Sequence, residues 1–108
     1  GILIFEGDFL NGKRNGKGKE YDYGELIYEG EFLNGKRNGE GKEYNNNGIL
    51  VFEGKYLNNE RVSGIQYDTN GNKINEFQNI NGEGKKYDYD GNIIYEGEFI
   101  NWKKEKDI

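Results

Sequence analysis

The chain has 108 residues, of which 32% are hydrophobic and 15% aromatic, and its formal net charge is −5. This length predicts one compact domain, and the low apolar fraction argues against a thick two-layer core. Aromatic rings each bury roughly 150–250 Å², so aromatic stacking is expected to hold a thin structure together. Without Cys or His, a zinc site of the usual kind and a disulfide framework are excluded.

Targeting signals are absent from residues 1–108. The chain contains no Met, which predicts that it is an internal part of a longer protein. No apolar run approaches the ~20 residues of a membrane span, and no signal peptide is visible, so any targeting segment would lie outside these residues. We expect a cytoplasmic location, with peripheral attachment to a membrane or the cytoskeleton as the alternative.

A repeated segment organises the chain. Residues 4–21, IFEGDFLNGKRNGKGKEY, and residues 28–44, YEGEFLNGKRNGEGKEY, are nearly the same text, and residues 51–61 and 94–104 repeat its first half. The spacings between Gly7, Gly30, Gly54 and Gly97 are 23, 24 and 43 residues, which indicates a repeat architecture. We divide the chain into units at residues 4–26, 27–50, 51–73, 74–93 (degenerate) and 94–108 (partial).

Each unit begins with a predicted strand in which an aromatic residue, a glycine and a second aromatic residue alternate. Period two places these residues on one face and acidic residues such as Glu6 and Asp8 on the other. A glycine inside a strand marks a close approach to the backbone. We expect the approaching group to be a ring from the adjacent strand, with a bound ligand as the alternative. The motif residues are Phe5, Gly7, Phe9, Tyr28, Gly30, Phe32, Phe52, Gly54, Tyr56, Tyr95, Gly97 and Phe99.

Two kinds of turn join the predicted strands. The first turns, at residues 11–16 and 34–39, contain the Asn-Gly pairs that favour hairpins. The return strands carry Gly-x-Gly and end at a tyrosine, and a second turn then leads to the next unit. Every connection is short and no segment has a helical period. The sequence therefore predicts an all-β fold, a single-layer antiparallel meander of β-hairpins.

Residues 62–81 depart from the repeat. The segment Ile74-Asn75-Glu76-Phe77 lacks the glycine after its Glu, and residues are missing before Asn81, so the hairpin there is expected to be shorter or bulged. Repeat decay and a tuned binding site are the two interpretations. The charged end, residues 102–108, is expected to cap the last strand or to begin the next turn.

The pattern Y-E-G-x-F-x-x-G-x-x-x-G-x-G resembles the MORN repeat (membrane occupation and recognition nexus). Asn59 and Trp102 stand where later units should have glycine. The resemblance implies an elongated, MORN-type antiparallel β solenoid. It also implies contact with phosphoinositides or membranes, protein scaffolding and dimerisation, or the positioning of substrates beside attached enzymatic domains. The second unit carries the signature at Tyr28, Gly30, Phe32, Gly35, Gly39 and Gly41.

No set of residues predicts catalysis. The segment at residues 88–92 begins like a calcium loop but lacks the later bidentate Glu, so a turn is favoured. We expect no enzyme activity, no metal and no cofactor. Paired carboxylates recur with the repeat, which is typical of a solvated stripe rather than of a general acid and base; they are Glu6/Asp8, Glu29/Glu31 and Glu96/Glu98.

Charge is distributed unevenly along the predicted edges. Basic residues fall in first turns, and acidic residues fall in second turns on the opposite edge. A basic edge is suited to anionic head groups or to an acidic partner, although turns also need soluble residues. The candidate anionic-ligand edge is Lys13, Arg14, Lys36, Arg37, Arg61, Lys103 and Lys104, and the acidic edge is Asp22, Glu25, Asp68, Asp88 and Asp90.

We therefore predict a non-catalytic module for protein–protein interaction or scaffolding within a larger protein. The alternative is a phosphoinositide or anionic-membrane binding module that uses the Lys/Arg edge. The expected partners are proteins or phospholipid, and the net negative charge disfavours nucleic acid. Residues 2–10 form a terminal strand with no Pro, bulge signal or lysine cluster, so self-association through this strand is also expected.

Overall fold

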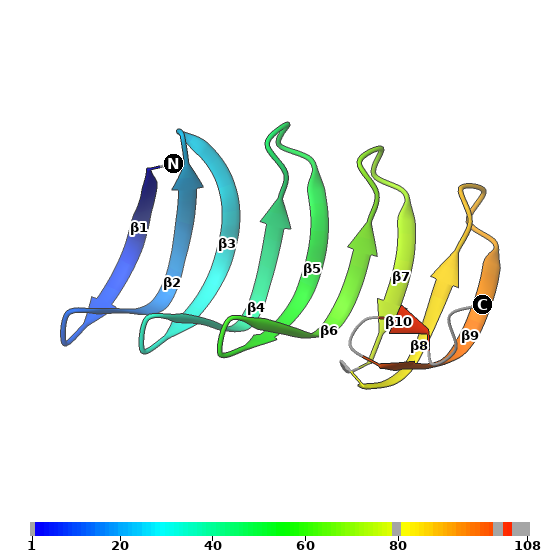
Figure 1. Cartoon of the computed structure of the whole chain (residues 1–108). Coiled ribbons are helices and arrows are strands. Elements are labelled where there is room, and N and C mark those ends of the chain that lie inside the picture. Colours follow the sequence, from blue (N-terminus) through cyan, green and yellow to red (C-terminus); the bar gives the residue numbers. More distant parts are fainter. Residues whose placement is uncertain (1, 79–80, 101–102, 105–108) are drawn as a thin grey trace.

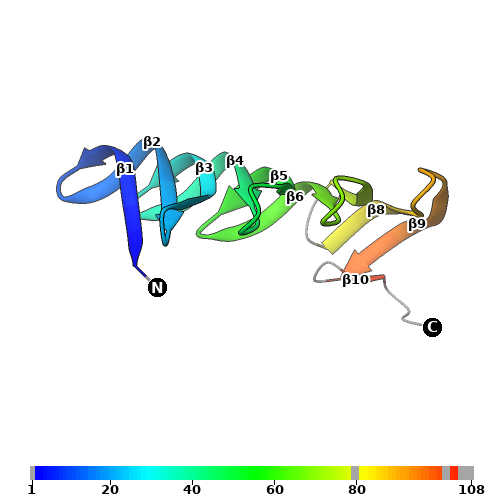
Figure 2. The same cartoon turned by 90° about the horizontal axis from the view of Figure 1, so that it is seen from above.

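The chain folds into one open, curved sheet. The computed structural model describes residues 2–78, 81–100 and 103–104. Ten strands lie in the sheet in chain order, from β1 to β10, and each neighbouring pair is antiparallel. The molecule measures 45 × 27 × 19 Å, and its first and last strands lie at opposite ends (Figures 1 and 2). The predicted all-β, single-layer meander is confirmed.

The strands range from two to ten residues in length. Each of the longer ones reaches from one long edge of the sheet to the other. Their bounds are β1 Leu3–Leu10, β2 Lys13–Asp22, β3 Glu25–Leu33, β4 Lys36–Tyr44, β5 Leu50–Leu57, β6 Glu60–Tyr67, β7 Lys73–Phe77, β8 Asn81–Tyr87, β9 Ile93–Ile100 and β10 Lys103–Lys104.

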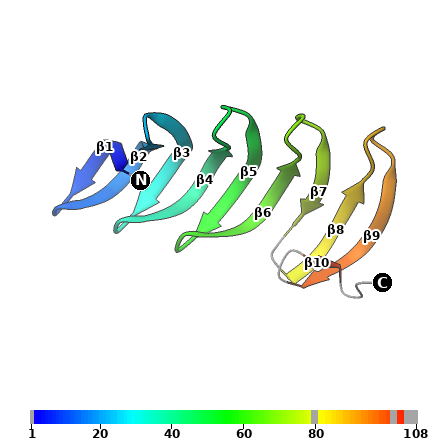
Figure 3. The same ribbon diagram turned by 45° about the horizontal axis from the view of Figure 1, so that its top comes forward.

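The described first turns share one long edge of the sheet, and the second turns share the other (Figures 1 and 3). Asn11 and Gly12 have φ values of 52° and 80°, the two positive angles that a two-residue hairpin turn requires. Asn59 replaces the glycine of the third turn and still adopts a φ of 73°. Asparagine tolerates this left-handed region better than most residues, so the departure from the repeat leaves the hairpin intact.

The core is a row of aromatic rings on one face of the sheet. Neighbouring rings meet edge to face with centroids 5.0–5.5 Å apart, an arrangement that aromatic pairs favour. Rings thus supply the apolar burial that a single layer otherwise lacks. The buried members are Tyr28, Phe32, Phe52, Tyr56, Phe77 and Phe99, and Phe5 and Tyr95 pack against them.

Glycines make room for these rings and for close strand pairing. A Cβ added at Gly41 would lie 2.3 Å from the Tyr28 hydroxyl oxygen. A Cβ added at Gly30 would lie 2.5 Å from the Glu40 carbonyl oxygen, 2.6 Å from the Gly41 Cα and 2.6 Å from the Tyr28 hydroxyl. The predicted close approach is therefore correct. The approaching group was wrong, because at Gly30 it is the backbone of β4 together with a ring of the same strand.

The irregular unit keeps the row of rings by moving one ring. Asn75 stands where earlier units have Phe5, Tyr28 or Phe52, and Phe77 stands where they have glycine. The Phe77 ring is buried and meets Phe99 edge to face at 5.5 Å. Strand β7 has only five residues, so the predicted shortening is found.

Candidate binding surfaces

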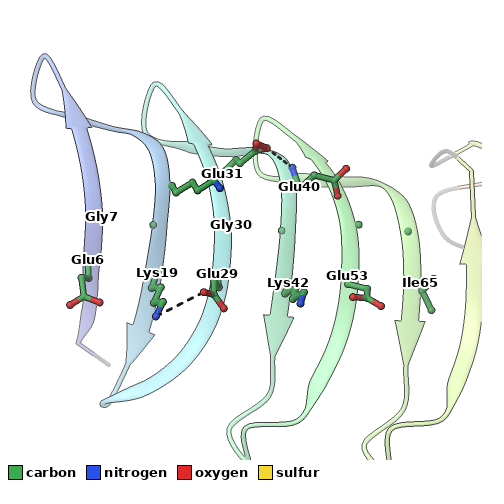
Figure 4. A pocket seen from close by; sticks show the side chains of 15 residues that line it. Glu6, Gly7, Lys19, Glu29, Gly30, Glu31, Glu40, Lys42, Glu53 and Ile65 are labelled. Carbon is green, nitrogen blue, oxygen red and sulfur yellow. Dashed lines mark hydrogen bonds and ion pairs between the residues drawn. The ribbon is translucent and has the colours of Figure 1, made fainter.

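A groove of about 900 Å³ runs along the face opposite the rings (Figure 4). Its floor is a row of glycines that lie directly opposite one another from β1 to β6. A side chain at these positions would point to the ring face, where a Cβ at Gly30 or Gly41 would meet the Tyr28 hydroxyl, so the floor presents only backbone to the groove. The row ends where Phe77 lies opposite the last glycine. Its members are Gly7, Gly18, Gly30, Gly41, Gly54 and Gly64.

An alternating charge ladder flanks the floor on the side of the second turns (Figure 4). Acidic and basic residues follow one another strand by strand, and each lies opposite the next. Opposite charges placed in this way stabilise a sheet by roughly 0.2–1 kcal/mol per pair. Lys19 Nζ, for example, lies 3.9 Å from Glu29 Oε2. In order from β1 to β9 the positions of the charge ladder are Glu6, Lys19, Glu29, Lys42, Glu53, Ile65, Glu76, Lys85 and Glu96.

A second charged row flanks the floor on the side of the first turns and includes Lys17, Glu31 and Glu40. The Glu31 carboxylate accepts a hydrogen bond from the Glu40 backbone N–H at 2.9 Å. Glu29 and Glu31 therefore stand on opposite sides of the floor, one in each row (Figure 4). The two carboxylates therefore do not face each other across the floor.

Tyrosines at the ends of the return strands donate hydrogen bonds to acidic residues of the charge ladder. The Tyr21 hydroxyl donates to Glu6 at 3.4 Å, and the Tyr67 hydroxyl donates to Glu53 at 2.6 Å. Burial, together with the hydrogen bond to Glu53, raises the pKa of Tyr67 to about 12. The carboxylates on the groove are thus positioned by the fold.

On the ring face, arginines from the starts of β2, β4 and β6 lie over the aromatic row. The guanidinium carbons of Arg14, Arg37 and Arg61 lie 4.3–4.5 Å from ring centroids, which is the geometry of cation–π contact. Each arginine thereby covers a ring from solvent with a planar, weakly hydrated cation. The rings contacted at these distances are Phe5, Tyr28 and Phe52.

Two glutamates link these arginines into a chain. Arg37 Nε donates to Glu20 at 2.8 Å, and Arg61 donates twice to Glu43, at 2.7 and 2.9 Å. Glu43 also accepts a hydrogen bond from Tyr56. Burial raises the pKa of Glu43, but the hydrogen bonds from Arg61 and Tyr56 and the neighbouring charges outweigh it, so this pKa lies below its usual value. Glu20 is only 6% exposed and lies 3.5 Å from Arg14 as well.

Sequence reasoning missed Glu20 and Glu43 as site residues. A signal was present, because both occur in a repeated Lys-Glu-Tyr segment of the return strand. Alternation from the neighbouring tyrosine, which lies on the groove side, places these glutamates on the ring face. What the sequence did not reveal is that the first-turn arginines fold back to meet them.

The predicted anionic-ligand edge is consequently divided. The side chains of Arg14, Arg37 and Arg61 lie on the ring face in the contacts given above. Lys13 and Lys36 remain exposed at the starts of β2 and β4, beside the first turns. Residues Lys103–Lys104 form β10, and the positions of their side chains lie outside the part that the structure describes.

The calcium-like segment is built as a turn. The Asp88 carboxylate accepts hydrogen bonds from the backbone N–H groups of Asp90 and Asn92, both at 2.9 Å, and Asp68 makes the same bonds one unit earlier. The Asn92 bond is the main cause that holds the pKa of Asp88 below its usual value. Within the described residues, no group of three or more acidic side chains is arranged to hold a metal ion.

Repeated hairpins in one layer, with rings on one face and a groove on the other, define a solenoid-type β-repeat protein. The family model of the MORN repeat matches residues 5–23 and 28–49. Residues 5–49 therefore carry MORN-type repeats, and the fold is consistent with a MORN repeat protein. MORN repeats are generally interaction or membrane-associated modules, and the family is generally non-catalytic.

Comparison with curated proteins gave no match. In the described ranges the structure contains no helix that is long and apolar enough to cross a membrane.

Proposed function

We propose that this chain is a non-catalytic scaffolding module that binds a protein segment in the groove. The observation that carries the proposal is the glycine floor, which crosses six strands without a side chain. Side chains are absent from the floor where a second backbone would lie, while charged rows on both sides offer polar contacts. Interfaces of this kind gain specificity from complementary charge.

The ring face offers less to a partner. Its rings are buried under arginines, and the arginines are held by the glutamates between them. Displacing one of these arginines would leave a charge in a half-buried site without its partner, which is costly. The groove side chains, by contrast, are already partly solvated, so a partner displaces mainly water there.

Position-specific photo-crosslinking tests this proposal. A photoreactive phenylalanine analogue would replace Lys42 in the groove, and in matched variants Lys13 in a first turn or Tyr23 in a second turn. We expect protein crosslinks from position 42 in cells that make the full-length protein, and few from the other two. Crosslinks to protein only from the turn positions would contradict the proposal. Imaging of the tagged protein in the same cells tests the proposed cytoplasmic location.

A second candidate function is binding to an anionic membrane. It is favoured by the first-turn edge, where the exposed lysines Lys13 and Lys36 lie beside the exposed leucines Leu10 and Leu33. Flotation with phosphatidylcholine vesicles, with and without phosphatidylinositol bisphosphate, tests it. Lys13→Glu with Lys36→Glu should abolish flotation if this edge binds, whereas Lys42→Glu should not. Membrane binding through this edge would be contradicted if the Lys13→Glu, Lys36→Glu variant floats as well as wild type. It would also be contradicted if wild type does not float at physiological salt.

A further inference from the structure

The charge ladder of the groove has one position that breaks its alternation. Lysine occupies the equivalent position in β2, β4 and β8, as Lys19, Lys42 and Lys85. In β6 the position is Ile65, which lies directly opposite Glu53 on one side and Glu76 on the other. The sheet therefore places an apolar side chain between two carboxylates where every comparable position has a cation.

The two carboxylates beside Ile65 are compensated unequally. Glu76 has an ion pair with Lys73, whose Nζ lies 3.2 Å from its Oε1. Glu53 accepts a hydrogen bond from the Tyr67 hydroxyl, and no ion pair joins it to any other residue in the described ranges. Glu53 is thus a half-buried, positioned acceptor that lacks a cation on the side of Ile65.

The surroundings of this gap favour a basic polypeptide as the occupant. The charged groups that line the groove include five glutamates and three lysines, so the lining is net acidic; they are Glu6, Glu29, Glu31, Glu40, Glu53, Lys17, Lys19 and Lys42. Beyond Ile65 a smaller hollow continues with Glu76, Glu83, Glu96 and Lys85, which is again net acidic. An extended chain fits a long glycine floor, whereas a small amine would fill only the gap.

We propose that the groove binds an extended basic peptide segment that is anchored by one lysine or arginine at the Ile65 gap. The aliphatic stem of the anchor lies on Ile65, and its cationic head pairs with Glu53, taking the place of the missing lysine of the charge ladder. Long cationic side chains commonly bury their stem on apolar surface in this way. This proposal rests on the proposed function and adds the chemical class of the partner. It also gives the irregular unit a role in binding.

Selection from a displayed library of random peptides against the 108-residue chain tests the proposal. We expect the selected peptides to share a lysine or arginine at one fixed position, with small or apolar neighbours. Their affinity, measured by fluorescence anisotropy, should fall more than about tenfold on Ile65→Lys or on Glu53→Gln. Ile65→Lys only restores the regular ladder, so its melting temperature should not fall, and lost binding would not reflect lost folding.

Leu57→Lys is the matched control. It adds the same charge as Ile65→Lys at an exposed position outside the groove lining, and it should retain the binding of the basic peptides. Selected peptides without a common basic residue, binding unaffected by Ile65→Lys, or a library that yields no groove binder would each overturn the inference. The proposed function fails separately, when position 42 gives no protein crosslinks. Groove crosslinks to a partner without a basic anchor would leave that function standing and reject the anchor.

Discussion

The glycines under the rings provide the sharpest test of how this sheet is held together. Gly30→Ala adds one carbon 2.5 Å from the Glu40 carbonyl oxygen and 2.6 Å from the Gly41 Cα, where ordinary contact begins near 3.4 Å. Gly30 is not among the residues with positive φ, so alanine carries no backbone strain there. The strands must instead move apart by about 1 Å. Overpacking costs roughly 1–3 kcal/mol and a weakened ladder hydrogen bond adds about 1 kcal/mol, so we expect a loss of about 3 kcal/mol.

Thermal melts followed by circular dichroism give the measurement. One kcal/mol shifts the melting temperature of a domain of this size by roughly 4–8 °C, so Gly30→Ala should melt at least about 10 °C lower, and Gly30→Val lower still. Glu31→Val loses the bond to the Glu40 N–H and should cost about 1 kcal/mol. Lys42→Ala on β4 removes the cross-strand charge pairs with Glu29 and Glu53 and should cost only about 1 kcal/mol. If Gly30→Ala and Lys42→Ala have the same melting temperature, close strand packing at the glycines is not what stabilises the sheet.

Three further predictions concern titration and association. The pKa of Glu43 is lowered in the folded chain, so its contribution to stability is lost as pH falls. Urea unfolding midpoints, measured from about pH 5 to pH 3, should therefore fall less in Glu43→Gln than in wild type. The exposed control Glu40→Gln should behave like wild type. Burial raises the pKa of Tyr28 and Tyr67 to about 12, so their phenolate absorbance should appear only well above pH ~10, where unfolded tyrosines titrate, and stability should fall as pH rises past that point. We propose that the β1 edge pairs with a second copy; in sedimentation Ile4→Lys should dissociate the dimer, and a monomeric wild type would contradict this.

The sequence predicted the architecture because its information is local and repeated. Asn11-Gly12 determines a two-residue turn by its own backbone preferences, and alternation in each strand separates Phe5 from Glu6. Once every connection is a short hairpin, an antiparallel meander follows from chain geometry alone. The repetition then tests each assignment several times within one chain.

Side-chain direction at the turns could not be predicted in the same way. Arg14 and Lys13 are adjacent in sequence and equally charged, yet Arg14 lies over a ring and Lys13 faces solvent. The outcome depends on Glu20, which lies six residues away on the same strand, and on rings from two strands. The direction of each side chain is determined by tertiary contacts, and the period of the repeat contains no information about these contacts.

A single-layer sheet must satisfy both of its faces without a second layer, and the two faces of this chain do so differently. On the ring face, apolar rings are covered by arginines, and Glu20 and Glu43 hold the arginines in place. On the groove face, charges neutralise one another across strands and leave the glycine floor open. The first arrangement is filled by the chain itself. The second is complete except at Ile65, where Glu53 has no lysine opposite it, and the proposed basic anchor would supply the missing charge there.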